Sequence, residues 1–265
     1  MGTVPQLEVL ICTYGEDGIR RIARASHPQV EGVRWFVNWQ MPEDVPARIP
    51  GEIEGRDDFK VAVHHDRGSS PNRNHALDLA EGEILLISDD DVTYTAEAMR
   101  GVIEAFRRRP ECDLLCFRFE NGTHHKMYPE FDLRHPVRGW YPSMVEIALR
   151  RKAVGGHRFN EHFGVCADFP AGEEELFVRG LLRAGVRGRF VPLTVCHHPG
   201  FSTGDRLSPL EMAHTKGAIF LKLFPATWPG RMLTHALRQP VGTRLAYVRQ
   251  WLSGVRDARR KNVFR

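Results

Sequence analysis

The chain has 265 residues, of which 42% are apolar and 26% are charged, and its formal net charge is +4. This composition is typical of a globular protein with a substantial core, so it excludes an intrinsically disordered chain, and the small net charge argues against a general nucleic-acid binder. No apolar run approaches the roughly 20 residues that a membrane span needs. The five cysteines form no CxxC pair, and we therefore expect a reducing, cytoplasmic location.

Short apolar runs bounded by turn residues recur along the first three quarters of the chain. Each run has the length of a β-strand, and several are apolar at nearly every position, which is typical of strands buried on both faces. The predicted strands, in chain order, are Leu7–Cys12, Val33–Val37, Phe59–Val63, Ile84–Ser88, Leu114–Phe119 and Arg189–Cys196.

Helical patterns lie between these strands. The clearest is Thr95–Arg109, where apolar residues recur at helical spacing and the first residue can serve as the N-cap. A second helix is predicted to begin with Ser70 as its cap and to end at Gly82 in the left-handed conformation. A third is predicted between Gly172 and Gly185. Strands that alternate with helices indicate an α/β protein whose central sheet is mostly parallel, with helices flanking it.

The chain changes character near residue 208, where strand signals stop and the pattern becomes helical. We therefore predict an α/β domain at residues 1–207 and a helical, basic extension at residues 208–265. In the last predicted helix, an apolar face is formed by Leu245, Val248, Leu252 and Val255. Residues 120–143 show little periodicity and are expected to form a loop or lid near the active site.

Three aspartates, Asp89, Asp90 and Asp91, directly follow the predicted strand Ile84–Ser88. Open α/β sheets bind ligands at the carboxyl ends of their strands. Like charges this close repel, so we expect a divalent cation, which takes carboxylate oxygens together with substrate phosphates. An isolated cluster of this kind is more often a solvated turn, but its place after a buried strand favours a nucleotide site.

Two further groups carry chemistry. His197 and His198 follow the last predicted strand, so either can reach the same edge of the sheet, and neutral imidazole binds Mn²⁺ better than Mg²⁺. Glu173, Glu174 and Glu175 begin a predicted helix, whose N-terminus stabilises the ionised carboxylate that a general base requires. Simple complementation of the helix dipole explains at least one of these three glutamates.

Another cationic group begins the helix that precedes the aspartates. Arg73, next to Asn74, lies in the first turn of that helix, and together with the free backbone amides there it suits an anionic ligand. The alternative is an exposed charge without a ligand.

Four groups of residues form an ordered set of motifs along the chain. They are the strand and turn VLICTY at Val9–Tyr14, SPNRNHAL at Ser70–Leu77, ILLISDDDV at Ile84–Val92, and GEEELF at Gly172–Phe177 followed by HPGFSTG at His198–Gly204. Together these motifs resemble the family 2 glycosyltransferases, enzymes with the GT-A fold, over roughly residues 8–204. The resemblance implies transfer of a sugar from a nucleoside diphosphate sugar, commonly UDP-linked, to an acceptor hydroxyl with inversion at the anomeric carbon.

The resemblance also implies a role for each matched residue. Thr13 and Tyr14 would border the nucleotide base, and Arg73 would lie near the nucleotide. Asp89 and Asp90 would contact the nucleotide sugar.

The metal and the base are assigned in the same way. Asp91, together with Asp89 and His198, would bind Mn²⁺ or Mg²⁺. Glu174 would be the general base, in a position where the family usually has aspartate, and Glu173 remains an alternative.

One departure from the family leaves the nucleobase open. The acidic run that usually follows the second strand is replaced by VNWQ at Val37–Gln40. Two other functions also remain as alternatives: another metal-dependent nucleotide enzyme, such as a nucleotidyltransferase or phosphatase, and a non-catalytic sugar-nucleotide or glycan-binding module. A phosphatase with an aspartate nucleophile carries its aspartates after the first strand, whereas here they follow the fourth.

The expected partners are the sugar donor and a glycan or lipid-linked acceptor, in cell-surface polysaccharide or glycolipid synthesis, with no nucleic acid. Between Arg231 and Arg265 there are nine basic residues and one acid, Asp257. Because a basic amphipathic helix binds anionic membrane surfaces, we expect this helix to contact the cytoplasmic face of a membrane. The alternative is a packed helix whose arginines are only solvated.

Overall fold

The computed structural model describes residues 4–121, 127–199 and 206–264. The chain divides into two compact units. The first comprises Met1–Arg67, Pro71–Arg158 and Gly180–Gly200, and the second comprises Gly68–Ser70, Phe159–Arg179 and Phe201–Arg265.

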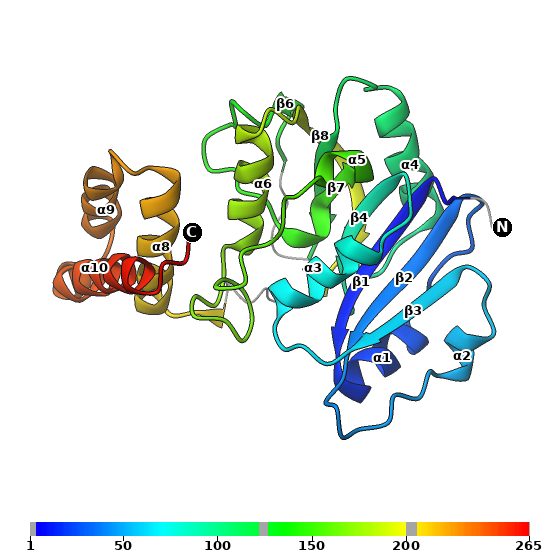
Figure 1. Cartoon of the computed structure of the whole chain (residues 1–265). Coiled ribbons are helices and arrows are strands. Elements are labelled where there is room, and N and C mark those ends of the chain that lie inside the picture. Colours follow the sequence, from blue (N-terminus) through cyan, green and yellow to red (C-terminus); the bar gives the residue numbers. More distant parts are fainter. Residues whose placement is uncertain (1–3, 122–126, 200–205, 265) are drawn as a thin grey trace. The chain divides into compact units, whose positions relative to one another are not determined.

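The first unit is built on a mixed sheet which, in the described residues, has eight strands in the order β3-β2-β1-β4-β7-β5-β8-β6 (Figure 1). Six strands lie where the sequence predicts them, each slightly longer: β1 (Leu7–Tyr14), β2 (Val33–Gln40), β3 (Phe59–His64), β4 (Ile84–Asp89), β5 (Leu114–Glu120) and β8 (Gly188–His197). These six run parallel, and β6 (Phe131–Asp132) and β7 (Ile147–Arg150) pair antiparallel to their neighbours. The mostly parallel α/β prediction is confirmed, and only the two short strands were missed.

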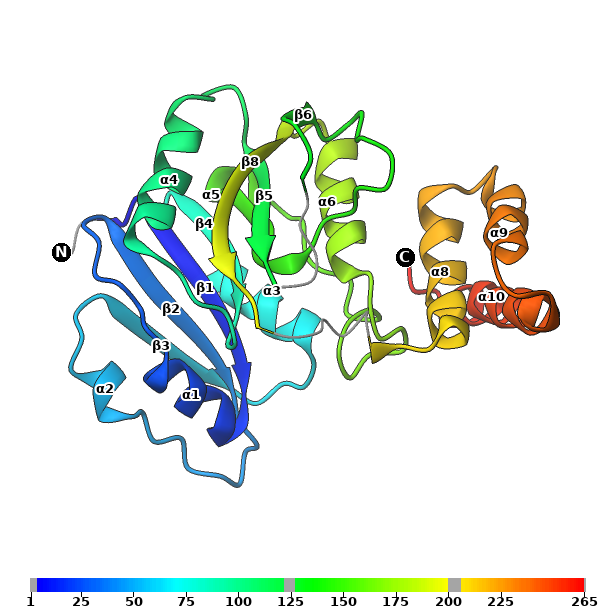
Figure 2. The same cartoon turned by 180° about the vertical axis from the view of Figure 1, so that it is seen from behind.

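Helices cover both faces of the sheet (Figures 1 and 2). One face carries α1 (Gly15–Arg24), α2 (Gly51–Glu54) and α4 (Ala96–Arg107), whose apolar residues share a core with alternate residues of β1, β2 and β4. The other face carries α3 (Ser69–Leu79). The remaining short elements of this unit are the 3₁₀ turn η1 (Met144–Glu146) and α5 (Arg151–Val154).

The helix predicted at Thr95–Arg109 is α4, and Thr95 caps it as expected. The Thr95 side chain accepts a hydrogen bond of 3.1 Å from the backbone N–H of Ala98. The pattern and the cap therefore agree, which is the condition for reading a helix boundary from sequence.

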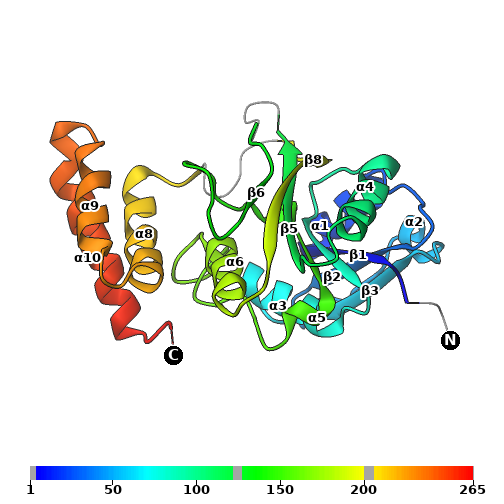
Figure 3. The ribbon, with the colours of Figure 1, turned by 90° about the horizontal axis from the view of Figure 1, so that it is seen from above.

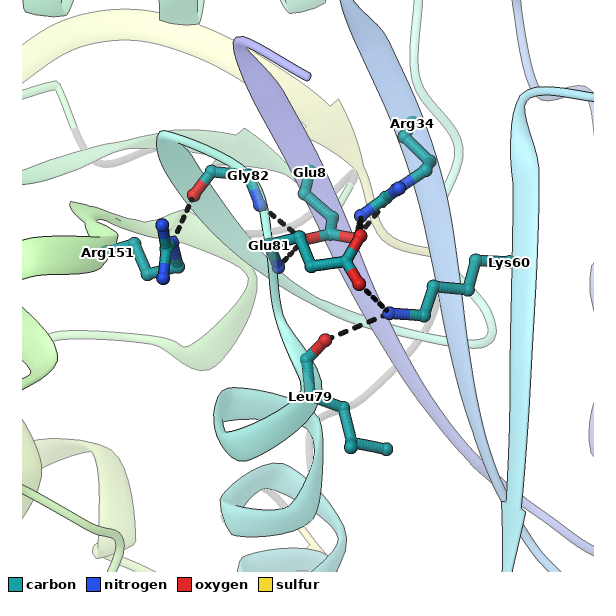
Figure 4. A network of polar contacts seen from close by, with 7 residues as sticks. All are labelled: Glu8, Arg34, Lys60, Leu79, Glu81, Gly82 and Arg151. Atoms are coloured by element: carbon teal, nitrogen blue, oxygen red, sulfur yellow. Dashed lines mark hydrogen bonds and ion pairs between the residues drawn. The ribbon is translucent and has the colours of Figure 1, made fainter. Parts of the chain in front are cut away.

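A buried carboxylate fixes the start of β4 (Figure 4). Glu8 is fully buried and accepts hydrogen bonds of 2.7 Å from the backbone N–H groups of Glu81 and Gly82, while Arg34 donates to it at 2.6 Å. The predicted left-handed conformation of Gly82 is wrong, since its φ is not positive. Glycine is needed there because a Cβ would lie 2.5 Å from the Glu8 Cβ, so a side chain would push the segment off its carboxylate anchor.

The second unit contains the start of α3 and a loop that binds it. Ser70 is not a helix cap: its hydroxyl donates at 2.6 Å to the carbonyl oxygen of Phe163, and α3 already begins at Ser69. The loop is followed by α6 (Glu173–Arg183), which starts after a left-handed Gly172 and is followed by a left-handed Gly185, as predicted.

Three helices complete the second unit: α8 (Pro209–Leu223), α9 (Trp228–Leu237) and α10 (Arg244–Arg260), with the 3₁₀ turn η2 (Val241–Thr243) before α10 (Figure 3). The predicted apolar face of α10 is wrong in part. Its buried residues are Tyr247, Trp251, Gly254, Val255 and Ala258, whereas Leu245 and Leu252 are exposed.

Two glycines determine which face of α10 packs against α8. A Cβ at Gly217 of α8 would overlap the backbone of Trp251, and a Cβ at Gly254 of α10 would overlap the backbone of His214. The two helices therefore touch backbone to backbone at these points, which an apolar stripe alone does not reveal. In the described part of the chain, no helix combines the length and apolar composition needed to cross a bilayer.

Candidate active site

The ends of β1, β4 and β8 bring most of the predicted residues to one edge of the sheet in the first unit. β1 and β4 are parallel neighbours, with Cys12 opposite Asp89. The chain after β4 then pairs with the end of β8, because Thr93 and His197 exchange backbone hydrogen bonds of 2.9 and 3.0 Å. The three aspartates thus lie between the ends of β1 and β8.

Asp89, the last residue of β4, is paired with Arg73 of α3. An Arg73 Nη2–H donates to Asp89 Oδ1 at 2.9 Å, and the Arg73 side chain is buried. A buried guanidinium requires such a partner. Asp89 therefore holds Arg73 at this edge of the sheet, and we call the edge with Asp89, Asp90 and Asp91 the acidic rim.

Asp90 is held by two residues, Thr13 at the end of β1 and Arg21 of α1. Arg21 of α1 donates to both of its oxygens, at 2.9 and 3.0 Å, and the Thr13 hydroxyl donates to Oδ2. Gly18 makes this approach possible, since a Cβ there would overlap Thr13 Oγ1 and lie 2.8 Å from Asp90 Oδ2. Because both oxygens of Asp90 are bonded, its geometry is that of a residue that positions the rim.

Asp91 has the one partner with metal-binding chemistry. His198 Nε2 lies 3.3 Å from Asp91 Oδ1, and the side chains are 12% and 43% exposed, respectively. Burial raises the pKa of the Asp91 carboxyl; the nearby His198 opposes this, and the charges of Asp89 and Asp90 add to it. His197 is exposed beside this pair, with its backbone bonded to Thr93.

The nearest thiol is chemically quiet. Burial raises the pKa of Cys12 to about 12, so it is protonated at neutral pH. A nucleophilic step requires the thiolate, so Cys12 is a poor nucleophile at this pH.

The residues present fit a divalent cation held jointly with a diphosphate. The described residues contain no group of three or more His, Cys, Asp or Glu arranged to hold a metal by themselves. Asp91 and His198, however, place one oxygen and one nitrogen donor within reach of a single ion, a donor set that suits Mn²⁺. Such ions commonly complete their coordination with phosphate oxygens and water.

A buried amide pair fixes the start of α3 against the sheet. Asn38, at the position where the family's acidic run is missing, donates to Asn72 Oδ1 at 2.6 Å and to its carbonyl oxygen at 2.8 Å. Asn72 in turn donates to the Thr13 carbonyl oxygen at 3.0 Å. The VNWQ departure thus supplies a scaffold that links β2 and β1 to the turn that carries Arg73.

The remaining predicted residues lie at the end of β1 and in the second unit. Tyr14, the last residue of β1, is 56% exposed. Glu173 and Glu174 belong to the second unit, where they form the first turn of α6; Glu173 is buried and Glu174 is half-buried. Glu175 pairs with Arg179 at 3.0 Å, so this glutamate serves its own helix. The closing turn 200–204 lies outside the described residues, as do residues 122–126 of the predicted lid.

Arg21 and Gly18 were missed by sequence reasoning. Their only local signal is that a helix with a central glycine follows the Thr13–Tyr14 turn directly. The contact between Arg21 and Asp90 joins residues 69 positions apart, which no periodicity in the sequence reveals.

The Arg21 contact gives a prediction with two opposite signs. Arg21→Met removes a positive charge from the acidic rim, so Mn²⁺ should bind several-fold more tightly and a metal-free nucleoside diphosphate several-fold more weakly. Both constants are measured by calorimetry. Arg20→Met is the matched control, because Arg20 pairs with Glu16 on the exposed surface of the same helix. Parallel changes in both constants, or equal effects in the two variants, would contradict this role.

One family model matches part of the chain. The sequence model described as Glycosyl transferase family 2 matches residues 49–165, which include Arg73 and the three aspartates. No curated protein matches the chain in sequence.

Solved structures share the fold. A crystal structure of S. aureus TarS 1-349 in complex with UDP-GlcNAc has a TM-score of 0.61 at 17% identity, over 95% of this chain and 80% of that one. Mannosyltransferase PcManGT from Pyrobaculum calidifontis, in complex with GDP-Man and Mn²⁺, has a TM-score of 0.56 at 15% identity, over 97% of this chain and 76% of that one. The chain spans 48% of the longer TarS structure. The predicted resemblance to family 2 glycosyltransferases and the GT-A type of fold are confirmed.

Proposed function

We propose that this protein transfers a sugar from a nucleoside diphosphate sugar to an acceptor hydroxyl, with inversion at the anomeric carbon. The observation that carries the proposal is the acidic rim, where the Asp91–His198 pair is the only one of the three aspartate contacts with two metal-binding donors. The family 2 match over this rim supports the same reaction.

The rim residues divide the work of binding the donor. Thr13 and Arg21 hold Asp90, and Arg73 holds Asp89 while offering its positive charge to the anionic donor. Asp91 and His198 would hold Mn²⁺ or Mg²⁺, which when bound stabilises the negative charge of the departing diphosphate. Tyr14 is exposed beside Thr13 and is free to border the base.

Glu174 is proposed as the general base that takes the acceptor's proton. It is half-buried in the first turn of α6, where the helix N-terminus favours the ionised carboxylate. Glu173 remains the alternative. Its carboxyl packs against Gly164, where an added Cβ would lie 3.2 Å from Oε1, so it is the more confined of the two.

The donor is proposed to be UDP-linked and the acceptor to be a glycan or a lipid-linked glycan, in cell-surface polysaccharide or glycolipid synthesis. The TarS structures with UDP-GlcNAc and with UDP support the first choice, and PcManGT with GDP-Man is the alternative that the test must include. A reducing location at the cytoplasmic face of a membrane is part of the proposal, supported by five cysteines that form no disulfide in the described residues.

A panel of sugar nucleotides tests the function. With Mn²⁺ present, one of them should raise the melting temperature, since a ligand that binds only the folded state stabilises it. That donor should release nucleoside diphosphate when a hydroxyl acceptor is added. Release of inorganic phosphate or pyrophosphate would indicate another nucleotide enzyme, and binding without turnover would indicate a binding module.

A further inference from the structure

Exposed apolar side chains gather around the turn that joins α9 to α10. Of thirteen large apolar side chains exposed in the described residues, five lie between positions 233 and 252. Three of them occupy the turn itself and are the most informative: Leu237 ends α9, Val241 begins η2 and Leu245 is the second residue of α10, with exposures of 56%, 76% and 62%. We call residues 237–245 the hairpin tip.

The apolar side chains of the tip lie outside the core that α10 forms with α8. α10 packs on α8 through the opposite side, where Trp251 is fully buried and Gly254 touches the backbone of α8. At 100° per residue, Leu245 and Leu252 lie on the face turned away from those residues. Figure 3 shows α9 and α10 joined by the short turn that carries the tip.

The conformation of the tip is stabilised by hydrogen bonds between one of its own side chains and its backbone. The Arg244 guanidinium donates to the carbonyl oxygens of Leu237 and Gln239, at 3.0 and 3.1 Å. The apolar side chains are therefore presented by an ordered turn.

The sequence on both sides of the tip carries charge of one sign only. From Met212 to Arg256 the chain contains no Asp or Glu, and Arg238 and Arg244 lie three residues before and three residues after Val241. Along α10, Arg249 and Arg256 fall on the same outward face as Leu245 and Leu252, at positions i+4 and i+11 from Leu245. Apolar and cationic side chains thus alternate on one surface.

We propose that the hairpin tip and the outward face of α10 dock on an anionic lipid bilayer. Such a surface offers an apolar interior for Leu237, Val241 and Leu245 and phosphate charges for the surrounding arginines. A second copy of the chain fits less well, because a symmetric contact would place like charges opposite each other without any acid to offset them. The inference rests on the location given in the proposed function, and it assigns the contact with the membrane to the tip as well as to the basic helix.

Vesicle sedimentation of the full chain tests the proposal. The protein should sediment with vesicles of equal parts phosphatidylcholine and phosphatidylglycerol and stay in solution with pure phosphatidylcholine. Val241→Ser with Leu245→Ser should weaken binding at least about 10-fold, since buried apolar area is lost. Arg238→Gln with Arg249→Gln should weaken it about 25-fold, because each arginine near such a surface adds about fivefold.

Matched controls separate the surface from general effects. Val4→Ser with Arg100→Gln changes an exposed apolar and an exposed basic residue elsewhere and should leave binding unchanged. All variants should keep the melting temperature and the release of nucleoside diphosphate in solution, so that failure of the membrane surface and failure of the proposed transfer are distinguishable.

Three results would overturn the proposal. They are wild-type protein that stays in solution with anionic vesicles, tip variants that bind as the wild type does, and a dimer in sedimentation velocity that the tip variants abolish while vesicles bind nothing. The last result would assign the surface to a second copy.

Discussion

Asp91→Asn is expected to lower kcat/KM by about 10³-fold, because several kcal/mol of transition-state stabilisation depend on the charge that the carboxylate helps to hold. Asparagine keeps the shape of the side chain and removes its charge, so His198 alone remains of the 3.3 Å pair. The effect should appear chiefly in kcat, since the interaction strengthens as the diphosphate departs. Steady-state kinetics with the donor found in the panel and excess Mn²⁺ measure it.

The control for Asp91 is another exposed carboxylate of the first unit. Asp44→Asn lies in the segment between β2 and α2 and should leave kcat/KM within about twofold, as surface charges usually do. Loss of activity in both variants would indicate a general charge effect. Near-normal turnover in Asp91→Asn would remove the carboxylate from the reaction.

Glu174→Gln is expected to retain donor binding and to lose about 10³-fold in kcat, within the range that general-base catalysis contributes. Glutamine preserves the size of the side chain but cannot accept the acceptor's proton. Donor affinity should not change, because the donor is bound by the rim residues Arg73 and Asp91 in this account. Calorimetry of the donor and single-turnover transfer separate the two quantities.

The neighbouring glutamates provide matched controls on the same helix turn. Glu175→Gln breaks only the 3.0 Å pair with Arg179 and should leave transfer nearly unchanged. Glu173→Gln alters a buried carboxyl. It should lower the melting temperature while changing the turnover little. Full activity in Glu174→Gln, with loss in Glu173→Gln, would move the base to Glu173.

The sequence predicted the elements of the sheet well because their signal is local. The run Ile84–Ser88 is apolar at nearly every position, and it is the buried strand β4. β6 has two residues and β7 has four, too few for a period to emerge. Where an element depends on contact with a distant one, the pattern failed: Gly82 is a glycine because of Glu8, 74 positions away.

The same distinction holds for the site. The sequence places Asp89, Asp90 and Asp91 at a strand end, yet it cannot say which side chain each one contacts. The structure gives them three different partners: Arg73, Arg21 and His198. Two of these pairs join residues more than 60 positions apart. The Arg21–Asp90 pair depends on how α1 packs on the sheet, and the His198–Asp91 pair depends on the bridge between Thr93 and His197, neither of which a single sequence encodes in any local period.

The central claim is that the acidic rim holds a divalent cation through Asp91 and His198. Anomalous scattering from a crystal grown with Mn²⁺ and a nucleoside diphosphate tests it most directly. A manganese peak is expected within bonding distance of Asp91 Oδ1 and His198 Nε2 and of the diphosphate oxygens, with Arg73 still on Asp89 and Arg21 still on Asp90. A diphosphate bound at this edge without a manganese peak, or with the peak at other residues, would contradict it.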